Sequence, residues 1–148
     1  MDKVKTILLI EDCPGDVRLT REAFRGVDDV LRFHVASDGV EAVSFLRREG
    51  VYGYAPRPDL ILLDLNLPRM DGRQVLSVIK QDDDLKMIPT VILTTSEAEA
   101  DIEAVYQLRA NCYFTKPVEF DAFESLVKTI SAFWLTMVRL PPQQQARC

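Results

Sequence analysis

Short apolar runs alternate with longer amphipathic segments along the chain. The apolar runs predict β-strands, because they are too short and too rich in β-branched residues to be amphipathic helices. The predicted strands are Val4–Ile10, Leu31–Ala36, Asp59–Asp64, Thr90–Thr94 and Cys112–Thr115. The segments between and after them carry apolar residues at helical spacing. The predicted helices are Asp16–Arg25, Gly39–Arg48, Arg73–Gln81, Ala98–Leu108 and Phe120–Val138.

This alternation is typical of an α/β domain, in which helices cover both faces of a parallel sheet. Asp38 precedes one predicted helix, and Ser96 stands three residues before Glu99 at the start of another. We expect Asp38 to cap its helix and Ser96 to form a capping box with Glu99. In open sheets of this kind the functional crevice lies beyond the carboxyl ends of the strands. The chemistry is therefore expected at those ends.

Length and composition limit the classes of protein to which the chain can belong. A chain of 148 residues fits a single domain with one core. It carries a formal net charge of −5, which disfavours nucleic acid as a direct ligand. No apolar stretch is long enough to span a membrane, and the polar N-terminus does not fit a signal peptide. We expect a cytoplasmic protein without a membrane partner. Its three cysteines are an odd number and lack a metal-binding spacing, so we expect reduced thiols with neither a disulfide framework nor a zinc site.

Polar groups follow or end four of the five predicted strands. Glu11 and Asp12 follow the first strand, Asp64 ends the third, Thr94 ends the fourth, and Lys116 follows the fifth. Three carboxylates brought together repel one another, so a divalent cation with oxygen ligands, best Mg²⁺, is expected to compensate their charge. Asp64 then remains able to attack a phosphoryl group, with Lys116 and Thr94 stabilising its equatorial oxygens. Each of these residues alone has an ordinary structural interpretation, and only their combination indicates this chemistry.

The residues Ile10–Asp12, Leu62–Gly72, Thr94 and Thr115–Pro117 together resemble the receiver domain of two-component response regulators. In that family a hydroxyl residue follows the acceptor aspartate by 30 positions and a lysine follows it by 52, and Thr94 and Lys116 stand at those positions after Asp64. The resemblance implies a flavodoxin-like (βα)5 fold with five parallel strands in the order 2-1-3-4-5. It covers a core of about residues 5–131 within one domain, 1–148. No output domain is therefore expected, and the signal should pass by contact with an unknown downstream protein.

The resemblance also implies specific roles. Asp64 is the phosphoacceptor and receives its phosphoryl group from a sensor histidine kinase. Lys116 pairs with the phosphoryl group, and Thr94 and Tyr113 form the switch. The implied Mg²⁺ ligands are Glu11, Asp12, Asp64 and the backbone carbonyl of Asn66. The protein is then a signalling phosphoacceptor rather than an enzyme, with at most self-catalysed phosphotransfer and dephosphorylation.

Two further stretches resemble the single-domain regulators that are paired with bacterial and cyanobacterial phytochromes, which are light-sensing histidine kinases. They are Ala110–Lys116 and the ending from Phe133–Thr136 to Leu140–Pro141. A phytochrome is therefore the expected kinase. Thr95 is larger than the Ala or Gly often found after the switch residue in this family, which leaves the lifetime of the phosphoryl group open.

Three other functions compete with this interpretation. Haloacid-dehalogenase-like phosphatases also use a strand-end aspartate with Mg²⁺, but their D-x-D motif lies on the first strand. A metal-dependent nuclease would need a second acid where this chain has Asn66. A pseudo-receiver, an interaction module without phosphorylation, is typical of chains that lack the acceptor, the acidic pair or the lysine, and this chain has all of them.

The predicted helix Phe120–Val138 would be about 28 Å long, whereas the strands that it covers span about 17 to 20 Å. Its last turns should therefore extend beyond the sheet. Apolar residues on more than one face of these turns predict a homodimer through the fourth and fifth βα units and this helix. The predicted interface residues are Phe133, Trp134, Met137, Val138 and Leu140. The alternative is that Trp134 and Leu140 fold back over their own domain.

The remaining reactive residues receive no functional role. His34 lies within a predicted strand, away from the strand ends, so a structural role is expected. Cys13 adjoins the acidic pair, which disfavours a reactive thiolate. Cys112 is expected to be a small core residue. Cys148 ends a polar tail, where it can crosslink in air.

Overall fold

In the computed structural model, residues 4–25 and 31–142 are described, and they contain a parallel sheet of five strands. The strands are β1 (Lys5–Ile10), β2 (Leu31–Ala36), β3 (Leu60–Leu63), β4 (Thr90–Thr94) and β5 (Cys112–Thr115). Neighbouring strands pair in parallel in the order β2-β1-β3-β4-β5. The predicted strands and their order are confirmed, with ends that differ by one residue at β1 and at each end of β3.

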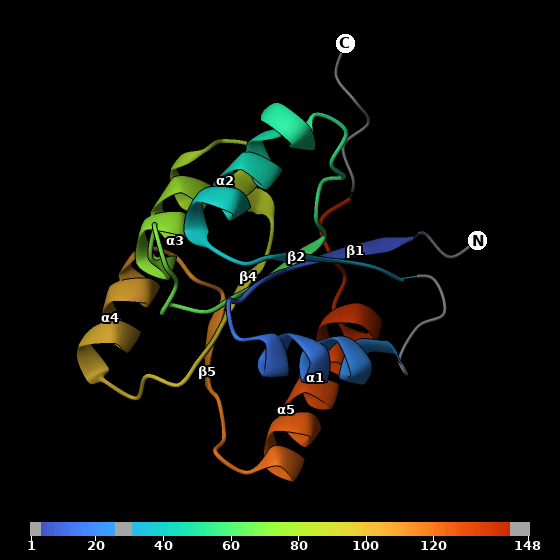
Figure 1. Cartoon of the computed structure of the whole chain (residues 1–148), viewed down its shortest axis with the longest axis vertical. Coiled ribbons are helices and arrows are strands. Elements are labelled where there is room, and N and C mark those ends of the chain that lie inside the picture. The colour runs from blue at the N-terminus through green and yellow to red at the C-terminus, as the bar shows by residue number, and fades with distance from the viewer. Residues whose placement is uncertain (1–3, 26–30, 143–148) are drawn as a thin grey trace.

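Helices cover both faces of the sheet. They are α1 (Pro14–Arg25), α2 (Gly39–Arg47), α3 (Gly72–Gln81), α4 (Glu99–Gln107) and α5 (Phe120–Ala132). Figure 1 shows α1 and α5 side by side below the sheet, and α2, α3 and α4 grouped on its other side. Short helical turns follow at Gly50–Tyr52, Leu85–Met87 and Phe133–Met137. No helix within 4–25 and 31–142 is both long enough and apolar enough to cross a membrane.

Two apolar cores lie on opposite faces of the sheet, because successive strand residues point to opposite sides. In β1, Ile7 and Leu9 join the core under α1 and α5, whereas Leu8 and Ile10 join the core under α2, α3 and α4. These four side chains are at most 2% exposed. Burial on both faces explains why the central strands are apolar at nearly every position rather than at alternate ones.

An acidic side chain caps the N-terminus of α2 and of α3, whereas α4 has no side-chain cap. The side chain of Asp38 accepts from the Glu41 backbone N–H at 2.7 Å, so the predicted cap of α2 is confirmed. Asp71, which reads in sequence chiefly as a turn residue, caps α3 in a reciprocal capping box with Gln74. The capping box predicted for Ser96 is wrong, because Ala98 is the N-cap of α4.

The C-terminal helix is shorter than predicted. Helix α5 ends at Ala132, a π-helical turn covers Phe133–Met137, and Val138 is extended. The wide turn brings Leu135 to 1% exposure, and Trp134 and Leu140 pack against the core under α1 and α5. The alternative in which Trp134 and Leu140 fold back is therefore correct, and the extended overhanging helix is wrong. Of the predicted interface residues, all of which lie within the described chain, only Phe133 and Met137 remain widely exposed, at 48% and 75%.

Candidate functional site

The acidic residues predicted from the strand ends lie together at the carboxyl edge of the sheet. The parallel pairing of β1 with β3 sets Ile10 opposite Leu63, so the residues that follow, Glu11 and Asp64, stand at the same level. Glu11, Asp12 and Asp64 each offer an oxygen, and these oxygens lie within 4.8 Å of one another. Glu11 is 3% exposed and Asp64 is 6% exposed, whereas Asp12 faces solvent. The three acids thus form a half-buried oxygen cluster.

Lys116 projects into this cluster from the end of β5. Its backbone N–H donates to the Thr94 carbonyl at 2.7 Å, which ties the ends of β4 and β5 together. Its Nζ donates to Glu11 Oε1 and, at 3.2 Å, to Asp64 Oδ2. A third contact joins Nζ to Asp16 Oδ2 at 2.9 Å. The lysine side chain is only 4% exposed, so its charge is compensated by carboxylates rather than by water.

The charges shift the ionisation of the buried groups. Burial raises the pKa of Glu11 to about 7, opposed by the Lys116 hydrogen bond and reinforced by the neighbouring Asp64. Burial by itself would lower the pKa of Lys116, but its hydrogen bonds to Glu11 and Asp16 raise it above the ordinary value. The lysine is therefore charged at neutral pH. One ammonium faces several carboxylates, which leaves an excess of negative charge at the cluster.

This excess fits a hard divalent cation. Carboxylate oxygens are the ligands that Mg²⁺ prefers, and Mg²⁺ binds through one or two carboxylates while it keeps waters or phosphate oxygens. Glu11, Asp12 and Asp64 supply such oxygens within one short span. Asn66 lies on the surface two residues after Asp64, and its backbone N–H donates to Asp64 Oδ1 at 3.2 Å. The cluster therefore has the donor set for a metal next to a carboxylate nucleophile.

Thr94 ends β4 with a hydroxyl that has no hydrogen-bond partner among the described residues. The residue is 0% exposed, and its Oγ1 makes no hydrogen bond within the described part of the chain. A buried hydroxyl without a partner costs about 1 to 3 kcal/mol, so such groups are uncommon in folded proteins. An oxygen-rich ligand on Asp64 would supply the missing acceptor.

Tyr113 and the loop after Thr94 form a connected network. The Tyr113 hydroxyl donates to the Ser96 carbonyl at 2.8 Å, and the Ser96 hydroxyl donates to Asp101 Oδ2 at 2.6 Å. Asp101 also pairs with Arg73 of α3, whose Nε lies 3.1 Å from Asp101 Oδ1. The hydrogen bond from Ser96, followed by that from Arg73, lowers the pKa of Asp101. The β4–α4 loop is thereby attached to α3, α4 and β5 at once.

Gly72 lets α3 start against the acceptor residue. A Cβ built on Gly72 would lie 2.3 Å from the Asp64 carbonyl oxygen and 2.6 Å from the Leu65 Cα, both backbone atoms. The Gly72 N–H donates to the Leu65 carbonyl at 2.9 Å. Only a residue without a side chain fits this close approach, which fixes the backbone on which Asp64 is mounted.

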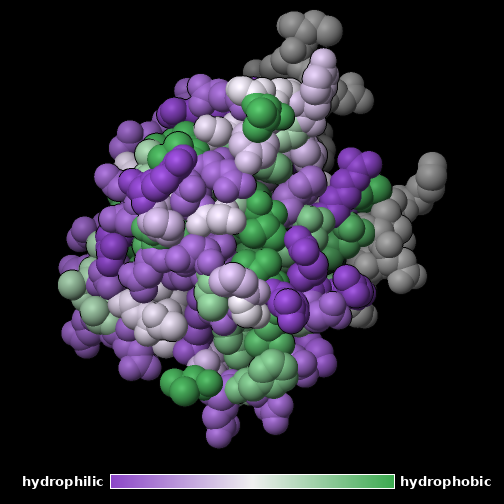
Figure 2. All heavy atoms as spheres, in the orientation of Figure 1, coloured by the Kyte–Doolittle hydropathy of each residue, from purple (hydrophilic) through white to green (hydrophobic). Residues whose placement is uncertain are grey.

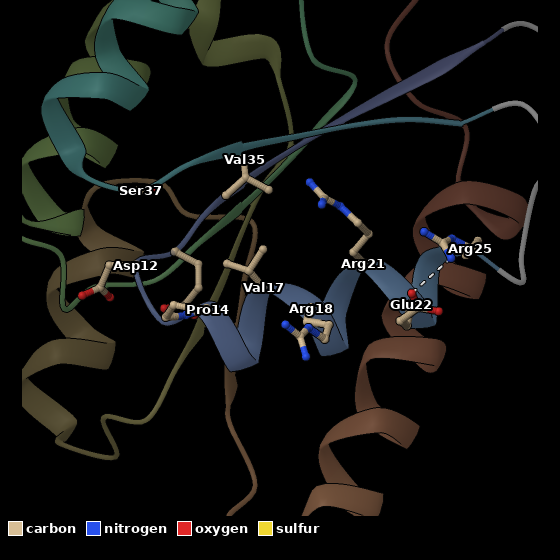
Figure 3. A pocket seen from close by; sticks show the side chains of 10 residues that line it. Asp12, Pro14, Val17, Arg18, Arg21, Glu22, Arg25, Val35 and Ser37 are labelled. Atoms are coloured by element: carbon tan, nitrogen blue, oxygen red, sulfur yellow. Dashed lines mark ion pairs between the residues drawn. The ribbon is translucent and has the colours of Figure 1, made fainter.

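A groove of about 460 Å³ leads away from the acidic cluster between α1 and β2. It begins at Glu11 and Asp12 and continues past three arginines, Arg18, Arg21 and Arg25. Figure 3 shows Val17 and Val35 facing each other across it, with Arg21 reaching toward the strands and Arg25 paired with Glu22. The guanidinium of Arg21 also lies 5.4 Å from the ring of Phe33. The groove thus joins the acceptor site to a positively charged helix face.

Exposed apolar side chains stand on the other flank of the site. Val118, in the β5–α5 connection, is fully exposed, and Phe120, the first residue of α5, is 64% exposed; both follow Lys116 within four residues. Figure 2 shows hydrophobic spheres among mostly hydrophilic ones at the lower end of the molecule, where Figure 1 places this connection. Two kinds of surface, one cationic and one apolar, therefore flank the cluster.

The structure brings Glu11, Asp12, Asp64 and Lys116 together, and a backbone hydrogen bond joins Thr94 to Lys116. The sequence interpretation missed three partners. Asp16 was assigned only to the start of a helix, and it contacts Lys116. Arg73 and Asp101 were not singled out, although they hold the loop after Thr94. An acid in the first turn of a helix that begins at the carboxyl edge of a sheet is the signal that would have identified Asp16.

The residues expected to be uninvolved lie apart from the cluster or on its margin. His34 is half-buried against Phe45, with ring centroids 5.3 Å apart, and burial followed by the charge of Arg32 lowers its pKa. Cys13 is exposed. Cys112 is half-buried rather than fully buried, and burial raises the pKa of its thiol. Cys148 lies outside the described residues.

Comparison with known proteins identifies relatives along nearly the whole chain. The family described as "Response regulator receiver domain" matches residues 7–128. The chain is 47% identical over 137 residues to response regulator Rcp1 of Synechocystis sp., and the match covers 93% of each chain. It is 38% identical over 136 residues to a probable methanogenesis regulatory protein, FilR2, of Methanothrix harundinacea, covering 91% of this chain and 86% of that protein.

Solved structures agree with these matches. A crystal structure of the Mn²⁺-bound form of Rcp1 has a TM-score of 0.89 at 47% identity and covers 93% of this chain and 99% of its own. A phosphorylated cyanobacterial phytochrome response regulator, RcpA, has a TM-score of 0.93 at 47% identity, covering 95% and 100%. These proteins are similar to this chain in sequence as well as in fold.

Proposed function

The chain belongs to the response regulator receiver family, and on this premise we propose that it accepts a phosphoryl group on Asp64 with the help of Mg²⁺. The observation that carries the proposal is the convergence of Glu11, Asp12 and Asp64 within 4.8 Å, with the Lys116 ammonium 3.2 Å from Asp64. The competing enzyme functions would need a second acidic residue where this chain has Asn66. A pseudo-receiver would not need this complete set of groups.

The residues divide the chemistry among them. Asp64 attacks phosphorus, a P–O bond forms, the bond between phosphorus and the donor imidazole nitrogen breaks, and the electron pair stays on that nitrogen. Glu11, Asp12, Asp64 and the Asn66 carbonyl would hold the cation, which supplies positive charge to the phosphoryl oxygens when it is bound. Lys116 provides a second positive charge. Hydrolysis by water returns the Asp64 carboxylate and inorganic phosphate, so the protein is a signalling phosphoacceptor with at most self-catalysed turnover.

Thr94 and Tyr113 are proposed as the switch. The Thr94 hydroxyl, which has no partner within residues 4–25 and 31–142, would gain an acceptor when a phosphoryl oxygen arrives. That movement would pull on the loop that Tyr113 holds through Ser96. The two states would differ in the hydrogen bonds of this loop, which is how a local charge change becomes a surface rearrangement. The output would then be contact with a downstream protein.

The phosphoryl donor is proposed to be a sensor histidine kinase of the phytochrome type. This is supported by 47% identity to a regulator described as a cyanobacterial phytochrome response regulator and 38% identity to a structure described as a bacteriophytochrome response regulator. Phosphotransfer from a purified, autophosphorylated phytochrome kinase should exceed that from histidine kinases without a photoreceptor. Equal or slower transfer from the phytochrome would remove this assignment while leaving the acceptor site intact.

A homodimer through α4, β5 and the C-terminal segment remains a proposal, but fewer of the predicted interface residues are exposed for the contact. Trp134, Val138 and Leu140 are partly buried in their own domain, so Phe133 and Met137 would carry the apolar contact. Sedimentation at micromolar concentration tests it. Met137→Glu should shift a dimer to monomer, whereas Val51→Glu, a change at a 92% exposed valine in the α2–β3 connection, should not. A wild type that is monomeric with and without phosphorylation rules the dimer out.

The acceptor assignment is tested with acetyl phosphate as a small phosphodonor and Mg²⁺. Mass spectrometry of the wild type should show one added phosphoryl group, mapped to the peptide that contains Asp64. Asp64→Asn and chelation of the metal should each abolish it, whereas Asp83→Asn, at a 99% exposed side chain, should leave it unchanged. Labelling that survives Asp64→Asn at the wild-type rate would overturn the proposal.

A further inference from the structure

Asp16 makes the least expected contact at the acceptor site. It lies in the first turn of α1, yet its Oδ2 is 2.9 Å from the Nζ of Lys116, 100 positions later in the chain. Its side chain is 29% exposed, against 4% for Lys116. Asp16 therefore lies at the solvent side of a buried cation.

Asp16 is separate from the group that could hold a metal. The three acids whose oxygens come within 4.8 Å of one another are Glu11, Asp12 and Asp64, and Asp16 is not among them. Among the described residues, its side chain contacts only the lysine. Any role of Asp16 in the site is therefore exerted through Lys116.

The lysine has three N–H donors, and the structure directs them at three carboxylates, those of Glu11, Asp16 and Asp64. The contact with Asp64, at 3.2 Å, is longer than the other two. When a phosphoryl group forms on Asp64, one N–H has to turn to a phosphoryl oxygen. The donor now directed at Asp64 can do so while the other two contacts stay in place.

We propose that Asp16 is a positioning residue for phosphoryl transfer, which holds the Lys116 ammonium so that its third N–H meets the phosphoryl oxygen. This inference rests on the proposed function, because it concerns the same site. Glu11 and Asp16 together hold two of the donors and leave one rotational position for the third. Without Asp16 the ammonium can rotate toward water on the exposed side, and the geometry required for charge stabilisation is lost.

A purely structural role predicts different behaviour. An acid in the first turn of a helix stabilises it by interaction with the helix dipole, and loss of that charge would lower stability without changing the chemistry of folded protein. Asp16→Asn separates the two roles. The amide keeps an acceptor oxygen for Lys116 but removes the charge that favours the helix start.

The rate of Asp64 phosphorylation by acetyl phosphate and Mg²⁺ tests the inference. Asp16→Ala is expected to lower this rate about tenfold, and Asp16→Asn to restore it to within about twofold of wild type. Asp16→Ser, whose hydroxyl is too short to replace the carboxylate, is the second loss variant if the alanine variant does not fold. Asp121→Ala, at an exposed acid in the first turn of α5, is the matched control and should match wild type.

A double-mutant cycle identifies the partner. If Asp16 acts through Lys116, adding Asp16→Ala to Lys116→Ala should change the rate less than about twofold. The inference is overturned if Asp16→Ala slows phosphorylation equally in the wild-type and Lys116→Ala backgrounds, or if Asp16→Ala and Asp16→Ser both keep the wild-type rate. In either case, labelling of Asp64 in the wild type leaves the proposed function standing. A wild type that is not labelled on Asp64 overturns both.

Discussion

The hydroxyl of Tyr113 donates a hydrogen bond to the backbone carbonyl of Ser96 at 2.8 Å, two residues beyond Thr94. This bond links the last strand of the sheet, β5, to the loop that follows Thr94. The Ser96 side chain extends the link to Asp101 at 2.6 Å, and Asp101 extends it to Arg73. A displacement of Thr94 is therefore opposed by contacts on three neighbouring elements.

Tyr113→Phe should loosen this loop. Removal of one hydrogen bond is expected to lower the free energy of unfolding by about 1 kcal/mol and to increase hydrogen exchange at residues 95–98. Urea unfolding and exchange mass spectrometry measure the two effects. Tyr106→Phe, at a tyrosine of α4 that is 46% exposed, is the control. Equal exchange in both variants would show that the Tyr113 hydroxyl does not hold the loop.

Thr94→Val should stabilise the unphosphorylated protein. Valine keeps the shape of threonine and removes a buried hydroxyl that has no partner within residues 4–25 and 31–142, so the free energy of unfolding should rise by about 1 kcal/mol. The same variant should fail to respond to phosphorylation in the NMR spectrum of the β4–α4 loop.

Ser131→Ala is the control for this pair of effects. Ser131 of α5 is also fully buried, and its hydroxyl has no partner in the described chain. Its replacement should raise the free energy of unfolding by a similar amount, and the NMR spectrum of the β4–α4 loop should still respond to phosphorylation. Destabilisation by Thr94→Val would contradict the account, because it would mean that the hydroxyl is already satisfied.

Metal affinity should depend on pH through Glu11. The pKa of Glu11 is raised from 4.5 to about 7 without metal, and a carboxylate must lose its proton to bind a cation. Affinity should therefore rise about tenfold per pH unit below about pH 7 and level off above it. Calorimetric titration with Mg²⁺ from about pH 5.5 to about pH 8 checks this. A flat profile, or one that Glu11→Gln leaves unchanged, would contradict the prediction.

The raised pKa of Glu11 also determines in which direction the stability of the metal-free protein changes with pH. Between pH 4.5 and about 7 the folded state keeps a proton on Glu11 that the unfolded state has lost. The contribution of Glu11 to stability is therefore largest below pH 4.5 and falls as the pH rises toward about 7. Bound metal should remove this dependence, since it favours the charged carboxylate.

Gly72→Ala should damage both the fold and the acceptor. Its Cβ would lie 2.3 Å from the Asp64 carbonyl oxygen, so backbone has to move, at a cost of about 1 to 3 kcal/mol. Phosphorylation of Asp64 should slow as well. Gly15→Ala in α1 meets no atom within 4 Å and should stabilise by about 0.5 kcal/mol. Chemical denaturation of both variants distinguishes close packing from a general effect of glycine replacement.

The sheet and the acidic cluster were predictable because each depends on local pattern together with one topological rule. Apolar runs such as Leu60–Leu63 identify buried strands, and parallel strands bring their carboxyl ends to one edge. Glu11 and Asp64 could therefore be placed together before any coordinates were known.

The missed features depend on how separate elements pack. Apolar spacing after Ala132 fits a continued α-helix as well as the wide turn that buries Leu135, and only contact with the core decides between them. Ser96 has the composition of a cap, but its hydroxyl bonds to Asp101 within a network that includes Arg73. The contact of Asp16 with Lys116 likewise needs α1 to be placed against β5.

The most direct measurement of the central claim is a crystal structure of the protein with Mg²⁺ and beryllium fluoride, a mimic of the acyl phosphate. We expect the mimic on an Asp64 oxygen, with the Lys116 ammonium and the Thr94 hydroxyl each within hydrogen-bond distance of a fluorine and the metal held by Glu11 and Asp12. A structure in which Asp64 carries no mimic, or in which the Thr94 hydroxyl stays without a partner beside a bound mimic, would contradict the account.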